Sequence, residues 1–520
     1  MDRRHFLQSL SAFGGATLLP QCFSPAMAAD TSGYKALVCV FLFGGNDSHN
    51  NIVPLSSAEY NAYSTARGGP AEQNGLALPQ SSLLPISSNT GPPITGAGKT
   101  NSQLQSGGTA FGLHPALTNM AGLYNSSKKL AVVANTGVLL APTTLAQYNN
   151  RSVPLPPQLF SHSDMQSHWQ TMHADYPAIT GWGGRMAGVF NAAATGRLPV
   201  SVSLGGGGTF MKADAVSAYQ VLPMPYRNGA IDTASRIANV PRADVWWNWT
   251  GSDPQALFVN NTNVVRANLL ENQYAQVMGN ALAVGQYVSD AMYTESTVNG
   301  NTVYTLKYPV PGSWPTTNRL AAQLHSVAAM IAARQSLGVS RQIFFVSMGG
   351  FDNHGDQFGR DAVTGNKTLL AGTHFNLLAQ LDGALKVFYD ATVAMGVDNN
   401  VTTMTMSDFG RTLKSNGNGS DHGWGEHAFV LGGGVNGGRI LGEMPPVALN
   451  TSVDVGQGRL LPTTASDTYA ASFAKWLGAT DPELDAIFPN LNRFSARTLD
   501  LFVQSPVVGG GSLPGPAHGS

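Results

Sequence analysis

The chain has 520 residues, with 29 Lys and Arg, 30 Asp and Glu, and a formal net charge of -1. This balance excludes the strongly basic surface by which proteins bind nucleic acid or anionic membranes. The length exceeds that of a typical single domain, although one elaborated α/β domain is compatible with it.

The first 28 residues resemble a bacterial twin-arginine export signal. Arg3 and Arg4 precede a short apolar stretch, and Ala26-Met27-Ala28 has the pattern of a cleavage site. The apolar stretch is shorter than the ~20 residues that span a membrane. We therefore expect a signal peptide over 1–28, recognition by the twin-arginine translocation machinery, a periplasmic or secreted protein, and no stable membrane insertion. Cleavage leaves Cys39 as the only cysteine, which excludes an intramolecular disulfide.

The next segments predict the start of an α/β fold. "YKALVCVFLFGG" (34–45) is a near-continuous apolar run, typical of a strand buried on both faces. Residues 56–112 are rich in Gly, Ser, Pro and Asn and predict a surface excursion. A helix over 114–129 and a strand over 130–137 then complete a β-α-β unit, which predicts a right-handed crossover into a parallel sheet.

The middle of the chain is less regular. Residues 151–185 predict a proline-stiffened loop that leads into a short helix at about Ser163. "LPVSVSLGG" (198–206) predicts another strand. Residues 215–315 predict an insertion or cap on the sheet, with one long helix and one hairpin.

Helices and strands alternate again after Pro315. Two amphipathic helices, each followed by a strand, and a last strand are expected over 316–338, 341–350, 373–396, 401–410 and 427–434. The alternation predicts a three-layer α/β sandwich with a mostly parallel central sheet. One domain over 29–505 and a flexible tail over 506–520 are expected.

Polar side chains follow three of the predicted strands. The first strand is followed by Asp47, the second by Asp352 and His354, and the third by Asp408 and Arg411. In open parallel sheets, ligands bind at the carboxyl ends of the strands. These positions therefore predict one shared polar site.

The loop before the last strand adds His422 and His427. Carboxylates and imidazoles at one sheet edge are ligands for divalent ions such as zinc, manganese or iron. Two such ions about 4 Å apart can activate a nucleophile and hold the oxyanions of an ester. The alternative for each single residue stays open, because Asp408 could cap a helix and both histidines could be exposed in a loop.

Four segments carry a resemblance to a known family: "FGGNDSHNNIVP", "GGFDNHGDQ", "SDFGRT" and "DHGWGEHAFVLGGGVNGGRILGEMP". In this order behind a twin-arginine signal, they resemble an exported bacterial family catalogued as domain of unknown function 1501 (DUF1501), over nearly all of residues 1–505. That family looks like a remote branch of the alkaline phosphatase superfamily, which includes sulfatases. The resemblance implies an alkaline-phosphatase-like fold, one or two divalent ions (zinc, manganese or calcium), and hydrolysis of a phosphate or sulfate ester of a small molecule or glycan.

The resemblance also implies roles for individual residues. The positions that match metal ligands of the superfamily are Asp47, Asp352, His354, Asp408, and His422 or His427. Phe409 departs from the pattern, because phosphatases usually carry a metal-binding histidine there. A second metal would therefore have few ligands.

The nucleophile of the superfamily lies at a helix N-terminus, where free N–H groups stabilise an anion. "LFSHSDMQ" offers Ser161 and Ser163 as nucleophiles at such a place, although Ser163 could equally be a plain N-cap. Arg411 could bind the oxyanion of an ester bidentately. The rival hypothesis is a non-catalytic exported protein that keeps the fold and serves surface assembly or glycan binding.

Overall fold

The computed structural model describes residues 29–503 except 88–110, 176–177, 192–195, 197, 207, 214–217, 222, 224–225, 228–229, 232–263, 265–267, 300 and 316. The predicted signal peptide (1–28) and the predicted tail (506–520) lie outside the described residues. In the part that is described, no helix is both long and apolar enough to cross a membrane.

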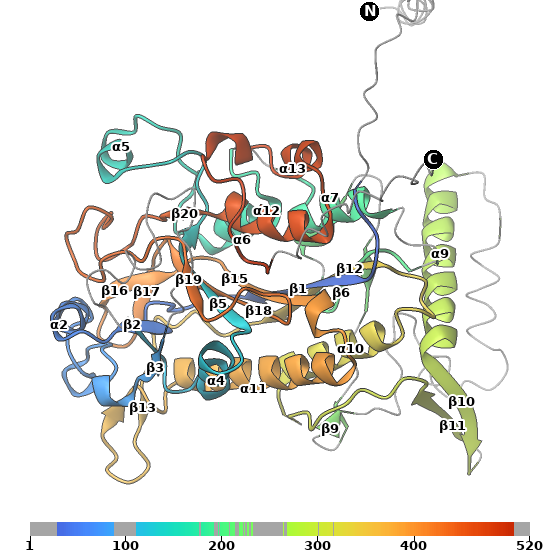
Figure 1. The fold of residues 1–520 in the computed structure, drawn as a ribbon, viewed down its shortest axis with the longest axis horizontal. Coiled ribbons are helices and arrows are strands. Elements are labelled where there is room, and N and C mark those ends of the chain that lie inside the picture. The colour runs from blue at the N-terminus through green and yellow to red at the C-terminus, as the bar shows by residue number, and fades with distance from the viewer. Residues whose placement is uncertain are drawn as a thin grey trace, which may run out of the picture.

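A nine-stranded sheet forms the centre of the fold (Figure 1). Its strands lie in the order β19 (Arg439–Leu441), β5 (Leu130–Gly137), β18 (Glu426–Gly432), β15 (Val401–Ser407), β1 (Lys35–Leu42), β12 (Arg341–Met348), β6 (Ser201–Ser203) and β7 (Tyr219–Gln220), with β20 (Thr464–Ala465) paired to β5. The pairs are parallel except those that β18 makes with β15 and β5. The prediction of an α/β fold with a mostly parallel central sheet is confirmed.

Strand β1 is the apolar run predicted from the sequence, and it lies between β15 and β12. Leu42, its last residue, is in register with Met348 at the end of β12 and Ser407 at the end of β15. The three strands therefore end at one edge of the sheet. The polar residues that follow them all start from this edge.

The direction of β18 could not be inferred from the apolar run that predicted it. Because β18 is antiparallel to both of its neighbours, β5 runs in the same direction as β1. Two strands nevertheless separate β5 from β1, so the predicted β-α-β start is a wide crossover rather than a pair of adjacent strands.

Helices cover both faces of the sheet (Figure 1). One face carries α4 (Thr118–Asn125), α10 (Arg319–Ala332) and α11 (Thr373–Ala394), and the other carries α6 (His162–Thr171), α7 (Trp182–Val189), α12 (Ser466–Leu477) and α13 (Asp481–Ile487). Alternate residues of β1 serve the two faces, with Val38 and Val40 in one core and Leu37 and Cys39 in the other. This alternation gives three layers with a core on each side of the sheet.

The described part of the predicted insertion contains both expected elements. They are the long helix α9 (Leu269–Met292) and the hairpin of β10 (Tyr293–Val298) and β11 (Asn301–Leu306). Figure 1 shows them at one side of the molecule. Further short elements are the helix α5 (Leu145–Asn150) and three two-stranded sheets: β8–β9 (Tyr226–Arg227, Ala230–Ile231), β13–β14 (Gly359–Arg360, Lys367–Thr368) and β16–β17 (Arg411–Ser415, Ser420–His422).

Residues 56–112 are not a simple surface excursion, which corrects the expectation from composition. The described part contains α2 (Ser57–Ala66), β3 (Leu84–Ile86) and β4 (Phe111–Leu113), which pairs with β2 (Ile52–Pro54). Side chains such as Tyr63, Leu76 and Leu78 are fully buried in a small core of their own. These apolar residues are spaced without a regular period, so the sequence pattern did not reveal the core.

Candidate metal centre

The loops after β1 and β12 meet at the sheet edge. Gly44, two residues after the end of β1, has a φ of +114°, and a Cβ there would lie 2.3 Å from the backbone nitrogen of Asp352. Only glycine allows both the conformation and the approach. This contact sets the backbone position from which Asp352 and His354 project.

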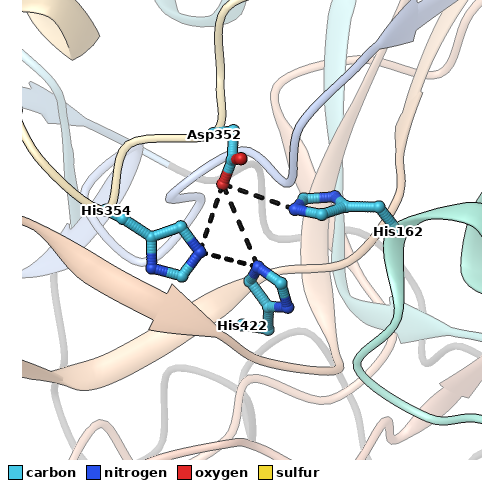
Figure 2. Close-up of side chains that lie close together, drawn as sticks. All are labelled: His162, Asp352, His354 and His422. Atoms are coloured by element: carbon cyan, nitrogen blue, oxygen red, sulfur yellow. Dashed lines mark hydrogen bonds and ion pairs between the residues drawn. The ribbon is translucent and has the colours of Figure 1, made fainter.

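Four side chains point toward one another at this edge: His162, Asp352, His354 and His422 (Figure 2). One nitrogen or oxygen of each lies within 4.8 Å of those of the other three. Asp352 Oδ1 is 3.3 Å from Nε2 of His162 and of His354, and 3.9 Å from Nε2 of His422. Ligand atoms around a tetrahedral zinc ion with bonds of about 2.0 Å are separated by about 3.3 Å. The four residues could therefore hold a metal ion.

Three different parts of the chain supply the four residues. His162 is the first residue of α6, after the proline-rich loop. Asp352 and His354 lie in the loop after β12. His422 ends β17, and the pairing of β17 with β16 places it opposite Arg411.

Each of the three imidazoles is anchored through Nδ1. The pairs are His162 with Asp408 Oδ2 at 2.6 Å, His354 with Asp421 Oδ1 at 3.0 Å, and His422 with the Phe160 carbonyl oxygen at 2.6 Å. Because these oxygens accept, each Nδ1 donates a hydrogen. In the neutral rings each Nε2 therefore presents a lone pair toward the other three residues. A second hydrogen bond of this kind is the usual way that proteins orient a metal-binding histidine.

The lone pairs need a cation between them. Nε2 of His354 and Nε2 of His422 are only 2.7 Å apart. Nε2 of His162 is buried and has no hydrogen-bond partner in the described part of the chain. Two lone pairs at this distance repel each other unless a proton lies between the nitrogens, and the two rings would move apart toward about 3.3 Å to share a tetrahedral ion. The donor set, three imidazoles and one carboxylate, suits zinc, iron or manganese.

A buried carboxylate and burial itself shift the pKa values of two of the imidazoles in opposite directions. Asp408 is fully buried, and its Oδ2 also accepts from Gln166 Nε2 at 2.8 Å and the Gly44 amide at 3.2 Å. The hydrogen bond to Asp408 raises the pKa of His162. Burial lowers the pKa of His422. A proton on His162 therefore competes with a metal ion for this ring.

This competition predicts a pH-dependent affinity for metal. A ligand histidine must be neutral at the coordinating nitrogen, so binding of Zn²⁺ or Mn²⁺ is expected to release a proton from His162 and to weaken as the pH falls through its raised pKa. Calorimetric titrations in buffers of different ionisation enthalpy measure the released proton. His162→Gln is expected to lose this proton release, and an unchanged release from the variant would contradict the assignment.

Arg411 is fully buried, and its donors reach the protein itself. Nε donates to the Gly45 carbonyl at 2.9 Å, Nη1 to the Ser420 carbonyl at 2.7 Å, and Nη2 to the Gly44 carbonyl and to Asp352 Oδ1. Burial alone would raise the pKa of Asp352, but the hydrogen bond and charge of Arg411 lower it. These contacts hold Asp352 in place. Because Nε, Nη1 and Nη2 of Arg411 all donate to protein oxygens, the arginine does not present a free pair of N–H groups to an ester oxyanion.

Asp47 lies outside the group of four. Its carboxylate is fully buried, and Oδ2 accepts from Arg67 and Gln357. Burial alone would raise the pKa of Asp47, but the charge of Arg67 lowers it. The cation beside Asp47 is therefore the Arg67 guanidinium, in a segment that the sequence pattern assigned to the surface.

His427 also lies outside the group of four. Its Nδ1 accepts a hydrogen bond from the Asn135 amide at 3.0 Å, so the hydrogen of the neutral ring is on Nε2. Burial lowers the pKa of His427 well below its ordinary value, which keeps the ring neutral. With this tautomer neither nitrogen has a free lone pair for a metal ion.

Ser161 and Ser163 contact a neighbouring carboxylate instead of the group of four. Both hydroxyls donate to Asp164 Oδ2, at 2.6 Å and 3.2 Å, and they lie 3.2 Å from each other. Ser161 is the residue before α6, and Ser163 lies in its first turn. Within the described residues, neither hydroxyl bonds to the four converging side chains.

The sequence did not predict the roles of three residues at the site: one of the four converging side chains and two neighbouring phenylalanines. His162 was visible only as the residue between two serines, and its place directly after a proline-rich loop at a helix start was the one available signal. Phe409, fully buried, packs its ring against His162 and His422, with centroids 4.9 Å and 4.8 Å apart. Phe160 has a φ of +73°, which is unusual for a bulky residue. The carbonyl oxygen of the same residue accepts the hydrogen bond that anchors His422.

Comparison with known proteins places most of the chain in one family model. A model described as "Protein of unknown function (DUF1501)" matches residues 34–471, a range that includes all four converging residues. No curated protein matches the chain.

Proposed function

The chain belongs to the DUF1501 family, and we propose that it is a divalent-metal-dependent hydrolase of phosphate or sulfate esters. The observation that carries the proposal is the convergence of three anchored Nε2 atoms and one carboxylate oxygen. The site is also open to a substrate, because the side chains of Asp352 and His354 are 52% and 43% exposed. A purely structural site is usually closed to solvent.

The residues around the site would have different roles in binding the ion and the substrate. Asp408 and Asp421 hold the rings of His162 and His354, and Arg411 holds Asp352. When bound, a divalent ion supplies a Lewis acid for an ester oxygen and lowers the pKa of a bound water. Phe409 excludes water from the buried side of the site.

The class of substrate follows from resemblance. Asp352, His354 and His422 match positions at which the alkaline phosphatase superfamily carries metal ligands, and we propose an alkaline-phosphatase-like fold on this ground. Location of the site at the carboxyl ends of β12 and β15 supports it. We favour one metal ion rather than two for two reasons. Asp47 pairs with Arg67, and Phe409 stands where phosphatases usually carry a metal-binding histidine.

A substrate screen tests the proposal. Metal-loaded protein is expected to hydrolyse aryl phosphate monoesters, diesters or aryl sulfates, and Asp352→Asn is expected to lower turnover by at least about 100-fold because a metal ligand is lost. Asp356→Asn is the matched control in the same loop, since asparagine tolerates the φ of +57° there. Equal turnover by wild type and Asp352→Asn would remove this site from the reaction.

A non-catalytic protein for surface assembly or glycan binding is the second candidate. Four protein ligands complete the shell of a tetrahedral ion, and the two serine hydroxyls bond to Asp164. The visible absorption of a Co²⁺ derivative separates the candidates. An intense four-coordinate spectrum that inorganic phosphate does not change, without turnover of any ester, would favour the structural role.

Export to the periplasm or beyond by the twin-arginine machinery is part of the proposal. It rests on Arg3, Arg4 and the cleavage pattern before residue 29, all outside the described residues. Fusing residues 1–28 to a reporter protein and following its export in a strain with and without the machinery tests this part.

A further inference from the structure

Two arginines contact the four converging residues in the described part of the chain, and they differ in what they can still bind. Arg411 is fully buried and donates to backbone carbonyls and Asp352. Arg459 is half-buried and donates from Nε to the carbonyl oxygen of His422 at 2.9 Å. Its Nη1 makes only a long contact of 3.4 Å to Gly456, and its Nη2 makes no hydrogen bond to a described residue.

The Arg459 guanidinium is held in place by two contacts. Its central carbon lies 5.1 Å from the centre of the Phe160 ring, and Nε is fixed by His422. Phe160 in turn accepts the Nδ1 hydrogen of His422. Stacking on an aromatic ring orients the plane of a guanidinium and leaves its outer N–H groups for an anion. The two outer N–H groups of the Arg459 guanidinium are therefore held in a fixed orientation next to His422, a predicted metal ligand.

Exposed carboxylates beside the site favour a second cation next to the metal ion for binding an anionic substrate. Asp352 and Asp421 are 52% and 41% exposed, so an anion that approaches from solvent meets two carboxylates. Arg411 already forms an ion pair with Asp352. Arg459 contacts the carbonyl oxygen of His422, the residue after Asp421 in β17, so its positive charge lies near this carboxylate.

We propose that Arg459 binds the oxyanion of an anionic ester while the ester occupies the candidate metal centre, which makes Arg459 a specificity-determining residue. The inference rests on the proposed function and narrows it to substrates with a free oxyanion, such as monoesters of phosphate or sulfate. An ester without such a charge would gain nothing from Arg459. Arginine suits this role because it forms two parallel N–H bonds to phosphate or sulfate oxygens.

Binding of inorganic phosphate to the Zn²⁺- or Mn²⁺-loaded protein tests the inference without requiring turnover. Arg459→Gln is expected to weaken phosphate binding by about 10- to 100-fold, the usual effect of losing a charge-assisted hydrogen bond. Its affinity for the metal ion itself is expected to stay within about threefold of wild type, because no metal ligand changes. Arg459→Lys, which keeps the charge but not the fork, is expected to fall between the two.

Arg334→Gln is the matched control. Arg334 is also half-buried, stacks on an aromatic ring (Tyr34, 5.4 Å) and donates to a backbone carbonyl, but it lies beside the opposite ends of β1 and β12. This variant is expected to bind phosphate like wild type.

The outcomes separate the two proposals. Unchanged phosphate affinity in Arg459→Gln overturns the role of Arg459, and so does a loss of metal affinity as large as the loss of phosphate affinity, which would show a structural effect on His422. If wild type binds phosphate through Arg459 but hydrolyses no ester, the hydrolase proposal fails while the anion site stands.

Discussion

Replacing Asp352, His354 or His422 with alanine is expected to weaken the binding of Zn²⁺ or Mn²⁺ by about 60- to 700-fold for each residue. The size follows from sharing a typical binding free energy of about 10–16 kcal/mol among four ligands, with about 1.4 kcal/mol for each tenfold change. Competition with a chromophoric chelator measures the affinity. Metal analysis after purification without chelator measures the stoichiometry, which is expected to be one ion per chain.

Asp47→Asn is the informative comparison for this experiment. The resemblance to the alkaline phosphatase superfamily predicts Asp47 as a metal ligand, but its carboxylate pairs with Arg67 and lies outside the group of four. The variant is therefore expected to retain the ion with nearly unchanged affinity. A loss of metal from Asp47→Asn while His354→Ala retains it would place the metal site at Asp47 and overturn the assignment.

Replacing Arg67 with alanine is expected to lower the free energy of unfolding by about 3–5 kcal/mol, because a carboxylate is left buried without its charge partner. Both side chains are fully buried. Arg67 also donates to the carbonyl oxygens of Thr412 and Leu413, which ties α2 and its small core to β16. Urea denaturation followed by fluorescence measures the change.

The double variant Arg67→Met with Asp47→Leu provides the control. Removing both charges leaves neither one unpaired, so the double variant is expected to lose less stability than the sum of the single variants. The pH dependence gives a second test. The pKa of Asp47 is lowered by Arg67, so the pair contributes stability above the ordinary value of 3.8, and this stability disappears as the pH falls through the lowered pKa. Asp47→Asn is expected to lose this acid-dependent component. Additive single effects would contradict the pairing.

Strands β1, β12 and β15 were predictable because all three are buried on both faces of the sheet. A strand in that position must be apolar along its whole length, so the runs stand out in a polar, glycine-rich chain. Their polar ends were predictable for the same reason. Asp352 and His354 follow from this logic, because adjacent parallel strands end at the same edge.

His162 and Arg67 were not predictable in the same way. Each reaches the sheet edge from a segment whose position depends on tertiary packing: the proline-rich loop before α6, and the small core around α2. The direction of β18 depends on which strands it pairs with, and an apolar run carries no direction. Tautomers are equally invisible, since only the Asn135 amide contact shows that His427 lacks a free lone pair.

The central position of β1 has a consequence for biosynthesis. The first residue of β1, Lys35, pairs with Arg341, and the other neighbour of β1 begins at Val401. The strand therefore leaves the ribosome long before either partner exists, and at roughly 5–20 residues per second the wait lasts tens of seconds. During that time its apolar residues and unpaired N–H and C=O groups are exposed to other chains. We therefore expect newly made chains to need protection of that segment, for example by chaperones, until the second half of the sheet has been translated.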